Sequence, residues 1–258
     1  MRRICDEGKC PACGACVQAC PQKCIEKIVT KDASFYYSID EKKCISCKKC
    51  ERVCPSLNSP IFNKAKKSYA AWRTDSTLHF ESASGGIATA FYEYAVTQKM
   101  FFSGVSLNDK FEAHFKLTDR VENIKDFKNS KYTFSFASDI FDEILNKLKC
   151  GYDVLFIGLP CQVAAIKNLV RITTVKGNLI TVDLVCHGTP PPIYLQQHIK
   201  AIELKQKQKF TKCFFRDTKF DTSNFVYTLY THNSEKPTYV KFVDENDNYQ
   251  IGYHNALI

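Results

Sequence analysis

The sequence contains no long apolar run and no apolar leader. None of its hydrophobic stretches approaches the ~20 consecutive residues that a helix needs to cross a bilayer. The chain opens with the charged stretch Met1–Glu7, which has no apolar region of the kind found in a signal peptide. These absences argue against a membrane-spanning or secreted protein, so we expect a soluble, cytoplasmic one.

The sequence also lacks a recognised nucleic-acid-binding motif, although its net charge is +9 over 258 residues. Lysines gather within 64–67 and within 205–209, and a solvated surface is the simpler explanation for each group. As a whole, the positive charge favours a phosphate-bearing cofactor or an acidic partner. We expect no nucleic acid among the partners and no membrane span.

Cysteine is distributed unevenly, since ten of the fourteen cysteines precede residue 55. Eight of these ten form two copies of the spacing Cys-x2-Cys-x2-Cys-x3-Cys-Pro, at Cys10–Pro21 and Cys44–Pro55. This is the ligand pattern of a bacterial two-cluster ferredoxin, in which the fourth cysteine of each run ligates the other cluster. The predicted ligands are Cys10, Cys13, Cys16 and Cys54 for the first 4Fe–4S cluster, and Cys44, Cys47, Cys50 and Cys20 for the second.

Two other uses of clustered cysteines fit this pattern less well. Disulfide frameworks need an oxidising compartment and usually occur in short secreted chains. Zinc ribbons use two cysteine pairs, whereas each run here is a triplet closed by Cys-Pro. Gly14, inside the first run, has no Cβ and lets the loop curl until its N–H groups approach cluster sulfur. We therefore expect two clusters, in an anaerobic cell that keeps oxygen away from them.

Residues 1–58 and 69–258 are predicted to form two domains joined by a linker at 59–68. In the first domain Phe35, Tyr37 and Ile39 alternate with other residues, which predicts a hairpin that packs one face on the clusters. The second domain is richer in aromatic and β-branched residues, as an α/β core would be. Its apolar end at 256–258 has no polar tail, so we expect a truncated chain or a fragment.

A serine- and glycine-rich stretch, Ser82–Gly86, precedes apolar residues at helical spacing from Ile87 to Ala95. Ser84 is the expected N-cap of this helix. Two glycines in its first turn would let a ligand approach the backbone, where free N–H groups attract an anion such as a nucleotide phosphate. A tight turn without a ligand explains the same residues equally well.

A polar and aromatic stretch, Asn129–Ser135, lies between a predicted strand at 101–107 and an amphipathic helix with apolar residues from Ile140 to Leu148. In this stretch Lys131 offers a positive charge and Tyr132 offers an aromatic face for stacking. These residues are suited to line a pocket. The alternative is an ordinary surface loop.

Two short apolar runs, Val154–Ile157 and Leu179–Val185, are typical of buried central strands. A cysteine follows shortly after each, Cys161 and Cys186. Open α/β sheets bind ligands beyond the ends of such strands, so both cysteines are candidate site residues. The other unmatched cysteines are expected to be buried free thiols: Cys5, Cys24, Cys150 and Cys213. Later elements are predicted as a helix at about 193–204 and strands near 210–216, 225–230 and 239–243.

Four stretches of the second domain resemble the beta subunit family of coenzyme F420 hydrogenases and dehydrogenases. They follow the family's order and cover most of residues 70–230: Ser84–Thr89, Ser130–Ser135, Leu155–Gln162 and Asp183–Gly188. Forms with an attached two-cluster ferredoxin module also belong to this family. The resemblance implies an α+β ferredoxin-like two-cluster module followed by a mixed α/β flavin-binding domain.

The resemblance also implies a flavin, usually FAD, beside a 4Fe–4S cluster of its own. The implied flavin-site residues are Ser84, Gly85, Gly86, Thr89, Lys131, Tyr132 and Ser135. Cys161 and Cys186 match two ligands of the flavin-side cluster. The family supplies the other two from a later Cys-x2-Cys, which this sequence lacks after Cys186. We therefore do not expect a complete third cluster in these 258 residues.

The favoured function is an iron–sulfur flavoprotein oxidoreductase. Its clusters would exchange electrons with a redox partner (a ferredoxin or another oxidoreductase subunit), and its flavin would exchange hydride with coenzyme F420 or another acceptor. Two alternatives stay open: a ferredoxin-type module that docks a partner enzyme without flavin chemistry, and an enzyme for a sugar or tetrapyrrole. Lys131 and His187 are the candidate catalytic residues, although a packed, hydrogen-bonded histidine is the simpler explanation of His187.

Overall fold

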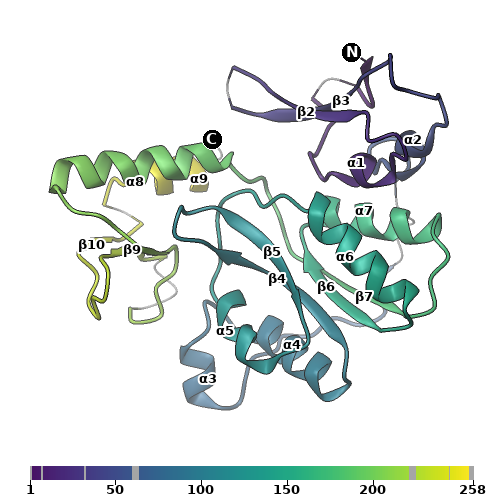
Figure 1. Ribbon diagram of the computed structural model, residues 1–258. Coiled ribbons are helices and arrows are strands. Elements are labelled where there is room, and N and C mark those ends of the chain that lie inside the picture. The colour runs from purple at the N-terminus through teal and green to yellow at the C-terminus, as the bar shows by residue number, and fades with distance from the viewer. Residues whose placement is uncertain are drawn as a thin grey trace.

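The computed structural model describes residues 2–6, 8–31, 33–59, 64–220, 225–243 and 245–255. Part of the predicted linker (60–63) and the apolar end (256–258) lie outside the described residues. The chain first forms an N-terminal module, then a four-stranded sheet with helices on both faces, then a smaller C-terminal unit (Figure 1). The predicted order of a cysteine-rich module before a mixed α/β domain is confirmed.

The N-terminal module is a three-stranded sheet flanked by the two cysteine loops. Its elements are β1 (Arg2–Arg3), α1 (Ala15–Ala19), β2 (Ile25–Val29), β3 (Phe35–Ile39) and α2 (Lys49–Val53). Strands β2 and β3 pair antiparallel with Ile25 opposite Ile39, which confirms the predicted hairpin. Tyr37 and Ile39 are buried against cysteines of both loops, so one face of the hairpin packs on the cysteine loops.

The central sheet has the strand order β5-β4-β6-β7, with β4, β6 and β7 parallel and β5 antiparallel at one edge. Its strands are β4 (Phe101–Leu107), β5 (Ala113–Thr118), β6 (Val154–Gly158) and β7 (Leu179–Asp183). The helices of this part are α3 (Ser76–Phe80), α4 (Ile87–Thr97), α5 (Ile124–Phe127), α6 (Ser138–Lys149) and α7 (Pro160–Arg171). The helix predicted over 140–148 and the strand predicted over 101–107 are confirmed.

Side-chain alternation along β6 divides the core into two layers. Val154 and Phe156 pack against α6 and α7, whereas Leu155 and Ile157 pack against α4 and α5. The two pairs of helices therefore cover opposite faces of the sheet (Figure 1). All five residues of β6 are buried, because a parallel strand in the middle of a covered sheet has no solvated face.

The prediction that Leu179–Val185 forms a second buried central strand is wrong. Strand β7 ends at Asp183 and lies at the edge of the sheet, with its residues exposed or only half-buried. Leu184 and Val185 lie beyond the strand, and Val185 is fully exposed. An apolar run shows that a strand is hydrophobic but not how many strands pair with it. An edge strand and a central strand can therefore have the same sequence pattern.

The C-terminal unit has its own core. It contains α8 (Pro192–Gln206), β8 (Lys212–Phe214), β9 (Tyr227–Tyr230), β10 (Tyr239–Lys241) and α9 (Asn248–His254). The three strands form an antiparallel sheet in the order β10-β9-β8. Leu195, Ile199, Tyr227 and Leu229 are fully buried at its centre. The region predicted as one domain, 69–258, thus contains two sheets with separate cores.

The N-terminal module packs directly on the central domain. Ala15 and Val53 belong to the same hydrophobic core as α6 and α7. Asn168, on α7, donates through Nδ2 to the carbonyl oxygens of Val53 (3.3 Å) and Asn58 (3.0 Å). Gln18 Nε2 donates to Asp142 Oδ1 on α6 at 2.8 Å. No helix in the described ranges is long and apolar enough to cross a membrane.

Candidate metal centres and cofactor cavity

The two cysteine loops have the same backbone shape. Residues with positive φ occupy matching positions: Ala12 (53°) and Gly14 (80°) in the first loop, Ser46 (55°) and Lys48 (57°) in the second. Because left-handed conformations are costly for residues with a Cβ, their recurrence at equal spacing shows that both loops wind in the same way. This winding directs the cysteines of each loop toward a common space.

The first cysteine group comprises Cys10, Cys13, Cys16 and Cys54. Burial raises the pKa of Cys16 well above its usual value, and the neighbouring Cys13, Cys10 and Cys54 raise it further. Cys54 therefore lies beside the first loop although it ends the second run. This is the arrangement that a crossed pair of cluster sites requires.

The second cysteine group comprises Cys20, Cys44, Cys47 and Cys50, which line one pocket. Burial acts to raise the pKa of Cys20. Hydrogen bonds from the backbone and side chain of Cys24 and from the backbone of Gln22 and Lys23 outweigh that effect and lower the pKa. A thiol that is stabilised as thiolate in this way is suited to ligate iron.

Backbone N–H groups directed at sulfur indicate whether the two cysteine groups fit iron–sulfur clusters. Ser46 N–H donates to Cys44 Sγ at 3.4 Å, and backbone bonds also reach the sulfurs of Cys13, Cys16 and Cys50. Such bonds stabilise cluster thiolates. The gathered thiols and the N–H groups directed at them fit two cubanes, whose irons the thiolates would bind.

Cys161 connects the first cysteine group with Cys186. It lies in the first turn of α7, where burial raises its pKa to about 11 with further contributions from Cys186 and Cys10. Cys161 in turn contributes to the raised pKa of Cys13. Gly188 N–H donates to the sulfur of the exposed Cys186 at 3.4 Å. The two cysteines that sequence reasoning singled out are thus brought together, next to the module.

The four unmatched cysteines lie in different surroundings. Cys213 packs against the core of the C-terminal unit and not in the N-terminal module, and burial raises its pKa. Cys150 is exposed, so the expectation of a buried thiol is wrong there; it stands at the C-terminal end of α6, where the chain meets solvent. Cys5 is half-buried, and burial raises its pKa with further contributions from Cys54 and Cys10. Cys24 is buried and lines the pocket of the second cysteine group.

A cavity of about 460 Å³, here called the cofactor cavity, opens beyond the carboxyl ends of β4 and β6. Six of the seven predicted flavin-site residues line it: Ser84, Gly85, Gly86, Thr89, Lys131 and Ser135. The seventh, Tyr132, does not line it, because its ring packs in the C-terminal core with its centroid 4.4 Å from that of Tyr253. The position is that expected for a ligand site in an open α/β sheet.

The start of α4 differs from the prediction. Gly86, with φ of 76°, is the N-cap instead of Ser84, and Ile87 is the first helical residue. A Cβ on Gly85 would lie 2.7 Å from the carbonyl oxygen of Ala71, so this glycine allows two chain segments to pack closely. The first turn of α4 still lines the cavity and presents free N–H groups there.

Lys131 is held in the wall of the cofactor cavity. Its Nζ donates to the carbonyl oxygens of Lys128 (2.6 Å) and Asp126 (3.2 Å). Burial lowers the pKa of Lys131 to about 7, and the nearby Asp126 carboxylate opposes this shift. In the same wall Asn129 Oδ1 is buried without a hydrogen-bond partner among the described residues. An unsatisfied buried acceptor beside a lysine fits a polar ligand.

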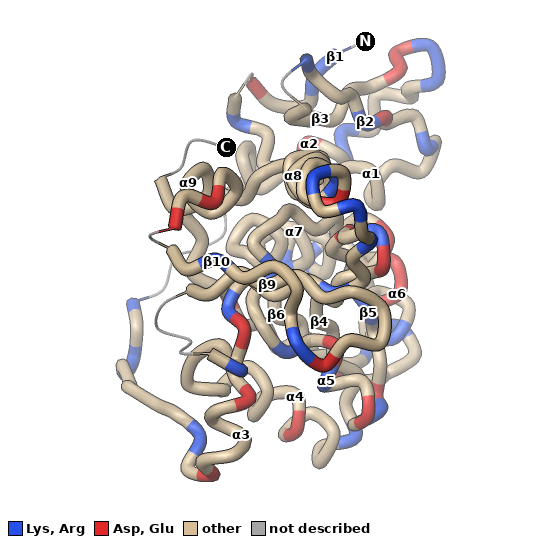
Figure 2. Tube along the Cα trace, turned by 90° about the vertical axis from the view of Figure 1, so that its left-hand side faces the viewer, with Lys and Arg blue, Asp and Glu red and all other residues tan. Residues whose placement is uncertain are grey.

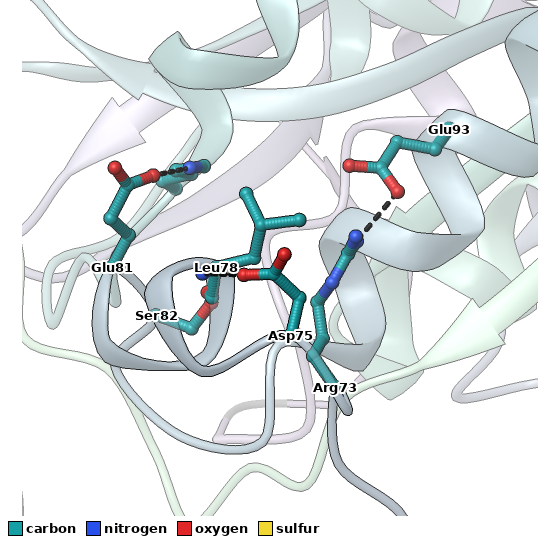
Figure 3. Close-up of polar contacts among 7 residues, drawn as sticks. Arg73, Asp75, Leu78, Glu81, Ser82 and Glu93 are labelled. Carbon is teal, nitrogen blue, oxygen red and sulfur yellow. Dashed lines mark hydrogen bonds and ion pairs between the residues drawn. The ribbon is translucent and has the colours of Figure 1, made fainter.

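A frame of polar contacts, which sequence reasoning missed, holds the outer wall of the cavity (Figure 3). Asp75 caps α3 by accepting from Leu78 N–H at 2.9 Å. Arg73 pairs with Glu93 on α4, and Lys128 pairs with Glu81, both at 2.6 Å. Asp75 before Ser-Thr-Leu is a recognisable cap signal, but the two ion pairs join segments that are 20 and 47 residues apart.

A second cavity of about 420 Å³ adjoins the first and shares its wall from Lys128 to Lys131. Lys125 and Lys212 also line it. His187, the other candidate catalytic residue, is exposed and its ring centroid lies 5.0 Å from that of Tyr253. The expectation of a packed histidine is therefore wrong, because the chain beyond β7 leaves the sheet and extends into solvent.

Comparison with protein families matches both parts of the chain. Residues 9–58 match a 4Fe-4S dicluster domain, and a second dicluster model matches residues 36–94. Residues 151–248 match the C terminus of the coenzyme F420 hydrogenase/dehydrogenase beta subunit. Two parts of the chain are therefore similar to known families, residues 9–58 to a dicluster domain and residues 151–248 to the C-terminal part of that beta subunit. The family match contains the stretches Leu155–Gln162 and Asp183–Gly188, whereas Ser84–Thr89 and Ser130–Ser135 lie outside it.

Comparison with solved structures gives a chain of the F420-reducing [NiFe] hydrogenase complex from Methanosarcina barkeri. The identity is 19%, and the alignment covers 67% of this chain and 60% of that one, with a TM-score of 0.45. A likeness at this level supports no conclusion about activity. No curated protein sequence matches this chain.

Proposed function

We propose that this chain is an iron–sulfur flavoprotein oxidoreductase that passes electrons between a protein partner and an acceptor bound at the cofactor cavity. The observation that carries the proposal is the position of Cys161. It lies beside Cys13 of the first cysteine group, while its helix neighbours Leu159 and Gln162 line the cofactor cavity. The predicted cluster ligands and the cavity are therefore adjacent across the start of α7.

A flavin is the proposed occupant of the cofactor cavity. The volume of about 460 Å³ lies within the usual range of roughly 300–1,000 Å³ for cofactor and ligand sites. The first turn of α4 offers N–H groups to a phosphate, and Lys131 offers positive charge on the other wall. A bound flavin accepts electrons singly or in pairs, which couples one-electron carriers to hydride transfer.

The two cysteine groups differ in their distance from the central domain. In the first loop Gly14 packs against Ser138 at the start of α6, and Cys13 lies near Cys161. The matching residue of the second loop, Lys48, is exposed, as are Lys42, Lys43 and Lys49. We infer that the first group is proximal to the cavity and that an acidic redox protein docks at the second.

The described Lys and Arg residues away from the second cysteine group do not form another positively charged surface for a partner. Figure 2 shows Lys and Arg distributed over the whole trace with Asp and Glu between them, and they are not gathered on one element. The net charge of +9 therefore reflects many separate positions. A local lysine group beside a cluster site acts mainly on the rate at which an acidic partner associates.

The acceptor is proposed to be coenzyme F420 or another hydride acceptor that occupies the second cavity. Lys125 and Lys212 in its wall suit an anionic molecule, and its shared wall with the cofactor cavity would place two ligands side by side. Lys131 belongs to both walls and, with a pKa near 7, can hold or release a proton at Nζ close to neutral pH. A sugar or tetrapyrrole acceptor would use the same space.

Flavin retention tests the proposal. Protein purified without air is denatured, and the supernatant is examined for yellow colour and flavin fluorescence. We expect about one flavin per chain, since the cofactor cavity alone is proposed to bind it. Lys131→Met should reduce flavin retention, whereas Lys212→Met, which changes only the second cavity, should not. Absence of flavin after reconstitution would contradict the proposal and favour a ferredoxin-type module that docks a partner enzyme.

A further inference from the structure

We propose that residues 73–85 form a lid over the cofactor cavity, and that the ion pair between Glu81 and Lys128 holds this lid shut. The inference rests on the proposed function, because it takes the cavity to bind a cofactor and says how that cofactor enters and leaves. The lid contains α3 and ends just before α4, and its last residues, from Ser82 on, line the cavity.

The two ends of the lid lie side by side and form a neck. Arg73 N–H donates to the carbonyl oxygen of Gly85 at 2.9 Å, and a Cβ on Gly85 would lie 2.7 Å from the carbonyl oxygen of Ala71. Arg73 also pairs with Glu93 on α4, which fixes the neck to the central domain (Figure 3). Surface loops whose ends meet in this way are compact and are frequently functional. The lid can therefore move about its neck while the chain on either side stays in place.

Hydrogen bonds within the lid hold its own shape. Asp75 Oδ1 accepts from Leu78 N–H at 2.9 Å, and Ser82 Oγ donates to the carbonyl oxygen of Leu78 at 2.8 Å. Glu81 N–H donates to the carbonyl oxygen of Thr77 at 3.0 Å. Because the donors and acceptors of these bonds all belong to the lid, the bonds are kept when it moves as one body.

The lid has little apolar anchorage to the rest of the protein. No residue of α3, which the structure describes in full, is buried, and Phe80 has 75% of its surface exposed. The neighbouring helix α4, in contrast, buries Tyr92 and Ala95 in the core of the central domain. Segments with few buried apolar contacts open at a lower cost in free energy than segments that are part of a core.

The contact that closes the lid is the ion pair between Glu81 and Lys128, here called the latch. Glu81 Oε2 accepts from Lys128 Nζ at 2.6 Å, with 53% of the Glu81 side chain and 19% of the Lys128 side chain exposed. Ser82, next to Glu81, and Lys128 both line the cofactor cavity, so the latch joins two segments of its wall. A partly exposed ion pair is weak and is screened by salt, which suits a contact that must break and form again.

The rate of cofactor release tests the proposal. Protein that holds FAD is diluted without air into buffer that lacks flavin, and the rise in flavin fluorescence is followed. Glu81→Gln weakens the latch at a residue that lines neither cavity, so FAD should leave about two to five times faster than from the wild type. Salt should speed release from the wild type more than from this variant.

Glu122→Gln is the matched control. It removes the carboxylate of another exposed ion pair, which Glu122 forms with Arg120 at 4.0 Å, and it should release FAD at the wild-type rate. Equal release rates from Glu81→Gln and the wild type, with the same dependence on salt, would overturn the lid.

Amide hydrogen exchange gives a readout that needs no bound flavin. Backbone amides at 84–90 and 128–131 lie in segments that line the cavity, and they should exchange faster in Glu81→Gln than in the wild type, because opening of the lid exposes them to water. Glu122→Gln should leave them unchanged. Unaltered exchange in Glu81→Gln would overturn the lid, whatever the cavity binds. Faster exchange in a protein that retains no FAD would support the lid and contradict the proposed flavin, so the two failures are distinguishable.

Discussion

Lys131 shows how one residue can serve both structure and chemistry. Two carbonyl oxygens hold its Nζ in a wall that separates two cavities. Burial makes its ammonium form costly, which is why its pKa falls to about 7 from the usual 10.5. Such a lysine changes its charge near neutral pH.

The lowered pKa of Lys131 predicts how stability depends on pH. Between pH 7 and 10.5 the unfolded chain binds the Lys131 proton and the folded chain does not, so stability rises with pH. The slope from one such group is at most about 1.4 kcal/mol per pH unit. Relative to Lys131→Met, the wild type should gain apparent melting temperature from pH 7 to pH 9 at a fixed scan rate. A constant difference between the two proteins would show that Lys131 stays charged.

At the scale of the element, the paired cysteine loops explain why the two repeats differ in sequence. The position after the second cysteine of each run has positive φ in both. In the first loop it is Gly14, where a Cβ would lie 2.8 Å from Ser138 Cβ, and in the second it is the exposed Lys48. One loop faces the central domain and the other faces solvent, so only the first requires glycine.

Exchanging these residue types should have opposite effects. Gly14→Ala adds a clash with α6 to the cost of left-handed backbone, roughly 1–2 kcal/mol for the backbone alone. Lys48→Gly removes that backbone cost at an open position and should leave stability unchanged or raise it. Thermal unfolding monitored by loss of cluster absorbance provides the measurement. Equal destabilisation by both substitutions would contradict the asymmetry of the loops.

The elements were predictable to different degrees from the sequence. The hairpin at Phe35–Ile39 and the helix at Ser138–Lys149 follow from local periodicity. The cap of α4 was misplaced because Ser84 is a typical cap residue, while the selection of Gly86 depends on packing against Arg73. The outer wall of the cavity depends on ion pairs between distant segments, which no local pattern records. The prediction that Tyr132 lines the cavity was wrong because its ring stacks on Tyr253 of α9, a contact between distant segments that local sequence does not show.

For the molecule as a whole, the start of α7 is the junction between the iron–sulfur module and the cofactor cavity. Cys161 lies there within the influence of both Cys13 and Cys186. It belongs to neither cysteine group, however. The protein should therefore fill its two N-terminal sites independently of Cys161.

Two substitutions distinguish the role of Cys161 from that of the predicted cluster ligands. Cys161→Ser should leave about eight irons per chain, whereas Cys13→Ser should reduce the number to about four. Both positions lie close together, so a general disturbance of the junction would affect them alike. A wild-type content near twelve irons, which three clusters would require, would show that Cys161 and Cys186 help to hold a third cluster.

The bonds from Asn168 to the backbone of Val53 and Asn58 have a consequence for how electrons arrive. Some redox proteins carry their metal centre on an arm that swings between donor and acceptor. Here an amide on α7 fastens the N-terminal module to the central domain, so we expect the module to stay in place. In the proposed function a redox partner would then have to bind the protein at the module, and the abundance of that partner would limit the rate.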